Sequence, residues 1–251
     1  MNALVQVRNL HKSFGSFEVL KGVDLDFVEG EVTSVVGQSG TGKSLLFKCI
    51  LGLIPPDDGS ITLGRKTLEG LDPDEMLDLR KDFGYAFQND ALFDSMTIWQ
   101  NIAFPLREVL RMKDLREIDR RVQGMLEWIE LPGVDSQLPA QLSGGQRKRI
   151  GIARALAIKP KILLFDEPTS GLDPILAWTI NNVVRRVNKE LGFTCILITH
   201  DIPAAFRISD KIAFLHEGHV VAVGSAPEVS SSNHEIVREF IDNSLFEGGP
   251  E

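Results

Sequence analysis

Long apolar runs are missing from this sequence. A helix that crosses a bilayer needs about 20 predominantly apolar residues, and no uninterrupted run of even about 18 occurs in the 251 residues. Residues 1–7 also lack the basic segment and the following apolar stretch of a secretory signal peptide. We therefore expect a chain that does not itself span a membrane and that resides in the cytoplasm.

Cysteine is scarce, and basic residues are outnumbered by acidic ones. The two cysteines, Cys49 and Cys195, lie far apart within apolar segments, which favours buried free thiols in a reducing compartment and leaves a disulfide as the alternative. The 27 Lys and Arg stand against 35 Asp and Glu, a formal net charge of −8. This balance argues against bulk attraction to nucleic acid or anionic lipid, so no nucleic-acid partner is expected.

Two kinds of strand pattern are present. Apolar residues alternate with polar ones over 5–7 and 23–27, which is typical of half-exposed antiparallel strands. Segments 32–36, 162–165 and 195–198 instead predict strands buried on both faces. Together they indicate an α/β fold, a parallel core sheet with helices packed on it, preceded by an antiparallel β-subdomain.

The middle of the chain is predicted to be helical. Apolar residues recur at helical spacing from Ile118 to Ile129, with charged residues between them. This region, about 88–158, lies between two core strands and is therefore a helical insertion. Residues 211–223 predict a late hairpin around Glu217-Gly218.

The tail carries a separate helix signal. Residues 232–235 resemble a capping box, and apolar residues follow on one face. We predict a main domain over 1–225 and a tail over 226–251 with one short amphipathic helix. That helix either closes its own domain or docks on a partner.

A phosphate-binding motif follows the strand at 32–36. Its sequence fits G-x-x-x-x-G-K-[ST] between a buried strand and a helix. Backbone N–H groups of such a loop converge on an anion, and the helix N-terminus adds the positive end of its dipole. Lys43 is expected to reach the β- and γ-phosphates, and the Ser44 hydroxyl to bind Mg²⁺. An incidental glycine-rich turn is the alternative. The predicted cradle consists of Gly37, Gln38, Ser39, Gly40, Thr41, Gly42, Lys43 and Ser44.

A nucleotide site of this kind also needs a carboxylate for the metal and a group that orients water. Asp166 and Glu167 stand at the end of the buried strand 162–165. Asp166 is the candidate Mg²⁺ ligand and Glu167 the candidate general base. Two acids in a solvated turn are the alternative.

A second glycine-rich segment opens the basic, apolar stretch 147–156. Small residues at a helix start expose N–H groups and a hydroxyl to an anion. Because the chain already has one phosphate site, we expect this second anion-binding helix start to complete the phosphate site of another copy of the chain. A flexible helix-start turn is the alternative. The segment is Leu142, Ser143, Gly144, Gly145 and Gln146.

In both content and order, these motifs resemble the nucleotide-binding subunits of ABC transporters over about residues 3–225. The P-loop is followed by a Q-loop glutamine, Gln88, then by the LSGGQ signature and by the Asp166-Glu167 pair. The D-loop at 170–173 comes next, and the switch histidine, His200, ends the series. The resemblance implies a P-loop NTPase core with a mixed sheet, helices on both faces and a helical subdomain.

The resemblance also implies roles for single residues. ATP and Mg²⁺ are the expected cofactors, bound in a head-to-tail homodimer that sandwiches two ATP molecules, with Asp173 of the D-loop beside them. Gln88 would touch Mg²⁺ and the attacking water, and His200 the γ-phosphate and Glu167. Alternatives are a plain loop glutamine and a histidine hydrogen-bonded at a strand end. Phe14 matches the aromatic residue, often Tyr in the family, that stacks on adenine. A phenyl ring discriminates little between the bases of ATP and GTP. The alternative is that Phe14 is an ordinary core residue.

The segment 91–106 is unusually apolar and is either core of the insertion or a docking site for a membrane-embedded permease. Residues 87–108 and 237–242 resemble the ATPases of MCE-type (Mla-like) systems, in which a permease pair and MCE-domain proteins move phospholipids or other lipids between bacterial membranes. This resemblance implies a peripheral subunit on the cytoplasmic face of the inner membrane. An importer of amino acids or other solutes, and a soluble ABC protein acting on ribosomes or DNA, remain alternatives.

Overall fold

A mixed sheet forms the centre of the molecule. The computed structural model describes residues 3–246, within which six strands form one sheet in the order β10-β9-β3-β8-β7-β6. Strand β3 pairs in parallel with β8 and β9, as β7 does with β8 and β6, whereas β9 and β10 form the predicted antiparallel hairpin. The strands are β3 (Val32–Val36), β6 (Phe83–Ala86), β7 (Ile162–Asp166), β8 (Thr194–Thr199), β9 (Lys211–His216) and β10 (His219–Gly224).

A second, antiparallel sheet is built mainly from the N-terminal residues. Its order is β2-β1-β4-β5, with β1 (Ala3–Phe14), β2 (Phe17–Val28), β4 (Asp58–Leu63) and β5 (Lys66–Thr67). The predicted alternation is confirmed, since Val5, Val7 and Phe27 are fully buried. Strand β4 contains a glycine and β5 is only two residues long, so neither shows a strand pattern in the sequence.

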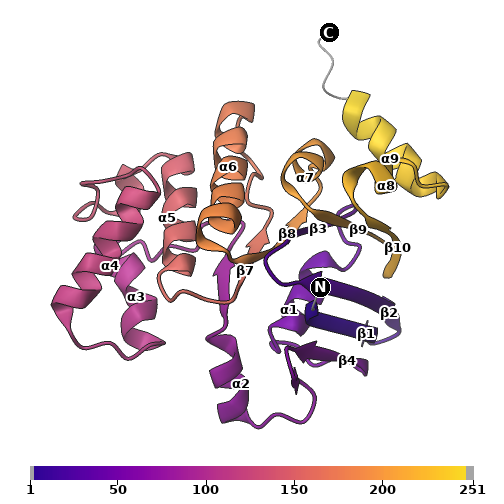
Figure 1. Cartoon of the computed structure of the whole chain (residues 1–251), viewed down its shortest axis with the longest axis horizontal. Coiled ribbons are helices and arrows are strands. Elements are labelled where there is room, and N and C mark those ends of the chain that lie inside the picture. The colour runs from indigo at the N-terminus through magenta and orange to yellow at the C-terminus, as the bar shows by residue number, and fades with distance from the viewer. Residues whose placement is uncertain (1–2, 247–251) are drawn as a thin grey trace.

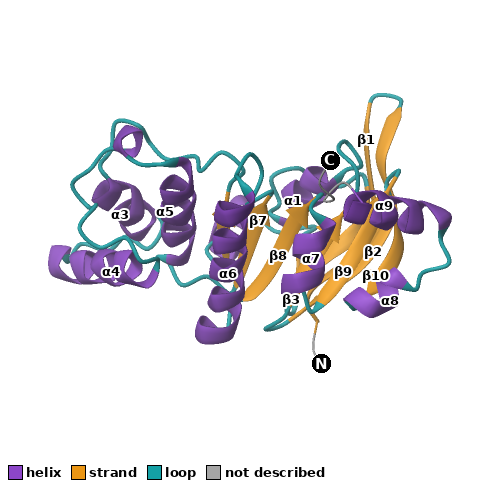
Figure 2. Ribbon diagram, turned by 90° about the horizontal axis from the view of Figure 1, so that it is seen from above, coloured by secondary structure: helices purple, strands orange, loops and turns teal. Residues whose placement is uncertain are grey.

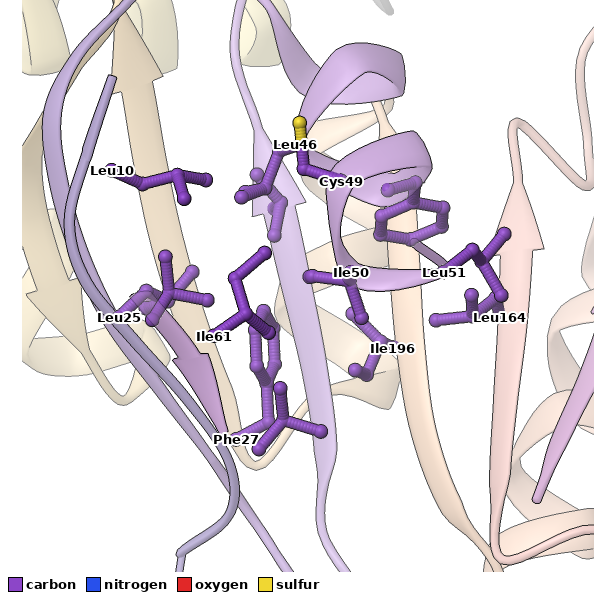
Figure 3. Close-up of a cluster of buried hydrophobic side chains, with 14 of the residues drawn as sticks. Leu10, Leu25, Phe27, Leu46, Cys49, Ile50, Leu51, Ile61, Leu164 and Ile196 are labelled. Carbon is purple, nitrogen blue, oxygen red and sulfur yellow. The ribbon is translucent and has the colours of Figure 1, made fainter. Parts of the chain in front are cut away.

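Helix α1 (Lys43–Ile50) fills the space between the two sheets. Its side chains Leu46 and Ile50 belong to a single core cluster with Leu25 and Ile61 of the antiparallel sheet and Ile196 of β8 (Figure 3). The start of this helix is thereby fixed against the end of β3, where the glycine-rich loop lies.

Alternate residues of the core strands face opposite helical layers. Leu164 of β7 belongs to the cluster with α1, whereas Leu163 and Phe165 pack with α6 (Pro174–Leu191). Figure 2 shows α6 and α7 (Ile202–Ile208) on the face of the sheet opposite α1. The predicted mixed α/β sheet with helices on both faces is confirmed.

A helical subdomain with its own core lies beside the sheet (Figure 1). It contains α3 (Ile98–Glu108), α4 (Leu115–Trp128), the 3-10 turn at Pro139–Gln141 and α5 (Gly144–Leu156). Helix α2 (Pro73–Arg80) precedes β6 outside this subdomain. Ile118 and Val122 of α4 are buried on one face, as the helical spacing predicts.

The tail differs from the prediction. Within 226–246 there are two helices, α8 (Ala226–Ser230) and α9 (Glu235–Phe246), rather than one. Pattern analysis missed α8 because it is a single turn. The predicted capping box at 232–235 is also not formed. Its Ser232 hydroxyl would accept a hydrogen bond from the Glu235 amide, but in the structure it accepts one from the His234 amide. Residues 247–251 of the predicted tail lie outside the described residues.

The two cysteines are free and buried, as predicted. Burial raises the pKa of the Cys49 thiol to about 11 and also raises that of Cys195, so both stay protonated and unreactive near neutral pH. Among the helices that the structure describes, none is long and apolar enough to cross a membrane.

Candidate active site

The glycine-rich loop and the ends of β7 and β8 border one polar cavity of about 500 Å³. Carboxyl ends of parallel strands meet at one edge of a sheet, so residues far apart in sequence converge there. The cavity is lined by Ser39, Gly40, Gly42, Lys43, Ser44, Leu45, Gln88, Asp166, Glu167, Ser170, Ile198 and His200. Six residues for which the sequence predicted a specific side-chain role therefore come together: Lys43, Ser44, Gln88, Asp166, Glu167 and His200.

The loop backbone needs its glycines. Gly40 and Gly42 have φ of 82° and 102°, in the left-handed region that favours glycine, and a Cβ on Gly37 would lie 2.1 Å from the Leu215 carbonyl oxygen. Gly42 is also the N-cap of α1 and, within the described chain, no side chain caps that helix. Its first N–H groups are therefore free to bind an anion.

Lys43 is only 6% exposed and is held by the loop itself. Its Nζ donates to the carbonyls of Gly37 at 2.8 Å and Gln38 at 2.6 Å. Because an ammonium has three donors, one remains for a phosphate oxygen. Burial lowers the pKa of Lys43, while the charges of Glu167 and Asp166 oppose that shift.

Asp166 has a partner that sequence analysis missed. The Tyr85 hydroxyl on β6 donates to Asp166 Oδ2 at 2.8 Å, and burial together with this bond raises the pKa of Tyr85, which keeps it a donor. Tyr85 fixes the carboxylate and leaves its other oxygen for a cation. Strand β6 is four residues long and contains a glycine, so no periodicity marked it.

Glu167 is oriented toward the cavity by a strained backbone. Its φ is 46°, and its N–H donates to the Ile198 carbonyl at 2.9 Å. Oε2 lies 2.9 Å from His200 Nδ1, but the two atoms are not aligned as a hydrogen bond, so Oε2 is buried without a hydrogen-bond partner among the described residues. Glu167 also lines the cavity, where its carboxylate can accept a proton from a bound water.

Gln88 follows β6 and reaches the cavity from the side of the helical subdomain. Its Nε2 donates to the Ser170 hydroxyl at 3.4 Å, a contact that the sequence did not reveal. Ser44, Gln88 and Asp166 supply the hard oxygen donors that Mg²⁺ prefers. Within residues 3–246 there is no cluster of three His, Cys, Asp or Glu that could hold a metal ion.

The remaining predicted residues lie outside this cavity lining. Ser143 and Gln146 form a capping box at the start of α5, with the Ser143 hydroxyl 3.3 Å from the Gln146 amide and with Gly144 and Gly145 between them. Asp173 caps α6 by accepting from the amides of residues 175 and 176. Phe14 is 55% exposed at the end of β1, so it is not a core residue.

Comparison with known proteins decides the family. A family model described as "ABC transporter" matches residues 20–170, more than half of the chain. The chain belongs to the ABC transporter family. As an ABC ATPase it hydrolyses ATP to drive transport.

Curated members of the family resemble this ABC ATPase over nearly its whole length. The "Probable ribonucleotide transport ATP-binding protein mkl" of Mycobacterium leprae is 37% identical over 96% of this chain and 70% of its own. The "Methionine import ATP-binding protein MetN" of Clostridioides difficile is 37% identical over 95% and 74%. The "Sulfate/thiosulfate import ATP-binding protein CysA" of Methylococcus capsulatus is 41% identical over 97% and 70%.

Solved ABC ATPase structures share the fold. A dimeric ATP-binding cassette in a post-hydrolysis state, bound to ADP and Pi, superposes with a TM-score of 0.80 at 34% identity, covering 88% of this chain and 98% of its own. The cbiO1 protein of Clostridium perfringens, part of the ABC transporter complex cbiONQ, gives a TM-score of 0.85 at 30% identity, covering 98% and 97%.

Proposed function

We propose that two copies of this chain bind two ATP molecules head to tail, and that ATP-driven closure and reopening of this dimer power a lipid-transporting permease. The proposed dimer rests on one observation. Residues of the P-loop, Asp166 and Glu167 line the cavity, whereas the start of α5 at Ser143–Gln146 lies outside it. A second copy would bring that helix start to the phosphates. The dimeric form of a related cassette supports this arrangement.

The chain's own residues account for the reaction in this proposal. The N–H groups of the loop and Lys43 hold the β- and γ-phosphates, and Phe14 stacks on the base. Ser44, Asp166 and Gln88 would hold Mg²⁺, which would neutralise phosphate charge when bound. The Glu167 carboxylate accepts a proton from the attacking water, and His200 positions this carboxylate and contacts the γ-phosphate.

Replacing Ser143 with Asp tests the dimer. Asp caps a helix about as well as Ser, so α5 stays folded, but its charge would repel the partner's ATP. We expect each monomer to bind ATP with unchanged affinity and ATP-driven dimerisation to be lost in size-exclusion chromatography with light scattering. The control is Asp114→Ser, an exchange of the same two residue types at the N-cap of α4, and this variant should dimerise. Normal dimers of Ser143→Asp would contradict the proposal.

A groove on the helical subdomain supports permease docking. It is an almost wholly apolar cavity of about 470 Å³ between β6, α3 and α5, lined in part by the exposed side chains of Phe87, Phe93 and Phe104. The segment 91–106 therefore contains residues of both kinds: Ile98 and Ile102 lie in the core of the helical subdomain, whereas Phe93 and Phe104 line the groove. Exposed apolar surface of this kind has a partner. We assign the groove to a cytoplasmic helix of the permease, and the chain would then lie peripherally on the inner membrane.

Charging the groove tests its role. Phe104→Asp should reduce recovery of the permease from native membranes by at least about tenfold, since a carboxylate would be buried on docking. Leu115→Asp is the matched control, because Leu115 is exposed on the same subdomain but lies on α4, outside the groove. ATP binding by both purified variants should equal that of the parent chain. Equal permease recovery with Phe104→Asp would remove the groove from the proposal.

The cargo rests on the resemblance of residues 87–108 and 237–242 to MCE-type ATPases. The names of the relatives instead favour solutes, namely ribonucleotides, methionine and sulfate. Purification of the tagged chain from its native membranes, with mass spectrometry of proteins and lipids, separates the two. A permease with an MCE-domain protein and phospholipid would support lipid transport, whereas a permease with a solute-binding protein would establish a solute importer.

A further inference from the structure

The loop that carries Gln88 has a strained backbone. Asp90 and Ala91, two and three residues after Gln88, have φ of 58° and 50°. Neither is glycine, so the left-handed conformation is unfavourable for both and persists only where the surroundings enforce it. The position of Gln88 in the cavity therefore depends on whatever holds these residues.

One helix holds this loop, the same α5 that begins with the Ser143–Gln146 segment. Lys148 Nζ donates to the Gln88 carbonyl, and Arg147 Nε donates to Asp90 Oδ2 at 3.3 Å. Arg154 donates to two carbonyls, Ala91 O at 2.7 Å and Asp90 O at 3.1 Å. These bonds tie both ends of the strained segment to α5.

The face of α5 is shaped for this contact. Arg147, Gly151 and Arg154 follow one another at i, i+4 and i+7 and so lie on one side of the helix. A Cβ on Gly151 would lie 3.2 Å from the Asp90 carbonyl oxygen, tighter than a relaxed contact. The absence of a side chain at Gly151 lets the loop backbone lie against the helix.

Arg154 also reaches the docking groove. It is the charged residue among the described groove-lining residues, and its guanidinium lies 5.9 Å from the centroid of the Phe93 ring. Burial lowers the pKa of Arg154 and the charge of Asp90 opposes this, but a guanidinium remains protonated in proteins. One half-buried cation thus touches the groove and the Gln88 loop together.

We propose that Arg154 is a positioning residue that fixes Gln88 relative to the signature helix α5. It holds the carbonyls of Asp90 and Ala91 with its planar fork, so that Gln88 would be in place for Mg²⁺ and water when they bind in the cavity. The inference rests on the proposed role of Gln88. It adds that hydrolysis requires an arginine that contacts neither nucleotide nor metal.

A double-mutant cycle on the full chain tests this proposal. Steady-state ATPase activity is measured for Arg154→Ala, Gln88→Ala and the double variant. We expect Arg154→Ala to lower kcat by about tenfold to a hundredfold, because small misplacements of catalytic groups have effects of this size. KM for MgATP should stay within about twofold, since the phosphate cradle is untouched. The double variant should be no slower than Gln88→Ala alone.

Arg149→Ala is the matched control. Arg149 lies on α5 and donates to the Ile129 carbonyl at 3.0 Å, away from the Gln88 loop, so kcat should change by less than about twofold. If Arg154→Ala fails to fold, Arg154→Lys is measured instead. It keeps the charge but loses the fork, and should show a smaller fall in kcat at unchanged KM.

The outcomes separate this inference from the proposed function. Additive losses in the double variant, or a raised KM with unchanged kcat, would overturn the positioning role of Arg154. A slow Gln88→Ala beside a fully active Arg154→Ala would reject the inference and leave the proposed role of Gln88 standing. A fully active Gln88→Ala would reject both.

Discussion

Glu167→Gln is expected to retain ATP binding and to lose ATP turnover by about 10²- to 10⁴-fold, the usual contribution of a general base. Gln has the same shape, so the bond from the residue 167 amide to the Ile198 carbonyl persists. It has no anionic oxygen in place of Oε2, which is buried without a hydrogen-bond partner among the described residues. The dimer should therefore close on ATP and stay closed. Phosphate release and size-exclusion chromatography measure the two effects.

The control for this substitution is Glu127→Gln, a change of the same kind on the exposed face of α4, which should hydrolyse ATP at the parent rate. Full activity of Glu167→Gln would show that another group takes the proton. His200, next to Glu167 in the cavity, would then be the first residue to test.

Lys43→Ala is expected to weaken ATP binding by about a hundredfold. The one Nζ donor that the loop leaves free can make a charge-assisted hydrogen bond to phosphate, and the loss of such a bond at about 3 kcal/mol amounts to about that factor in Kd. The substitution also leaves the Gly37 and Gln38 carbonyls without the donor that they now share, so the loop should become less ordered. Isothermal titration calorimetry with ATP and Mg²⁺ measures the change.

Lys48→Ala provides the comparison, because Lys48 is an exposed lysine in the last turn of the same helix. Its Kd for ATP should equal that of the parent chain. Thermal unfolding of both variants checks that α1 stays folded. An unchanged Kd for a folded Lys43→Ala would remove the lysine from the phosphate cradle.

Local features of the site were predictable from the sequence. The strand at 32–36, the loop at 37–44 and the helix after it are consecutive, so their geometry depends on glycine φ angles and helix-end N–H groups within one short segment. The same holds for the buried strands at 162–165 and 195–198, whose apolar runs indicate burial on both faces. Short elements such as β6 and α8 were not predicted, because they contain too few residues to show a periodic pattern of apolar side chains.

Contacts between distant segments were not predictable in the same way. The bond from Tyr85 to Asp166 spans 81 positions, and that from Gln88 to Ser170 spans 82. Arg154 was part of a helical pattern, and nothing in that pattern showed that it would bind the loop after β6.

The sequence by itself determined the reaction class, because the phosphate cradle and the acidic strand end are local motifs whose chemistry follows from residue type and spacing. Only the tertiary structure decided which groups share one cavity and which stand outside it. The strand order β3-β8-β7-β6 brings Lys43, Gln88, Asp166 and His200 together, while the packing of α5 on the helical subdomain leaves Ser143 outside that cavity. Strand order and helix packing depend on how the apolar faces of the whole chain are buried together, and no single segment of the sequence carries that information.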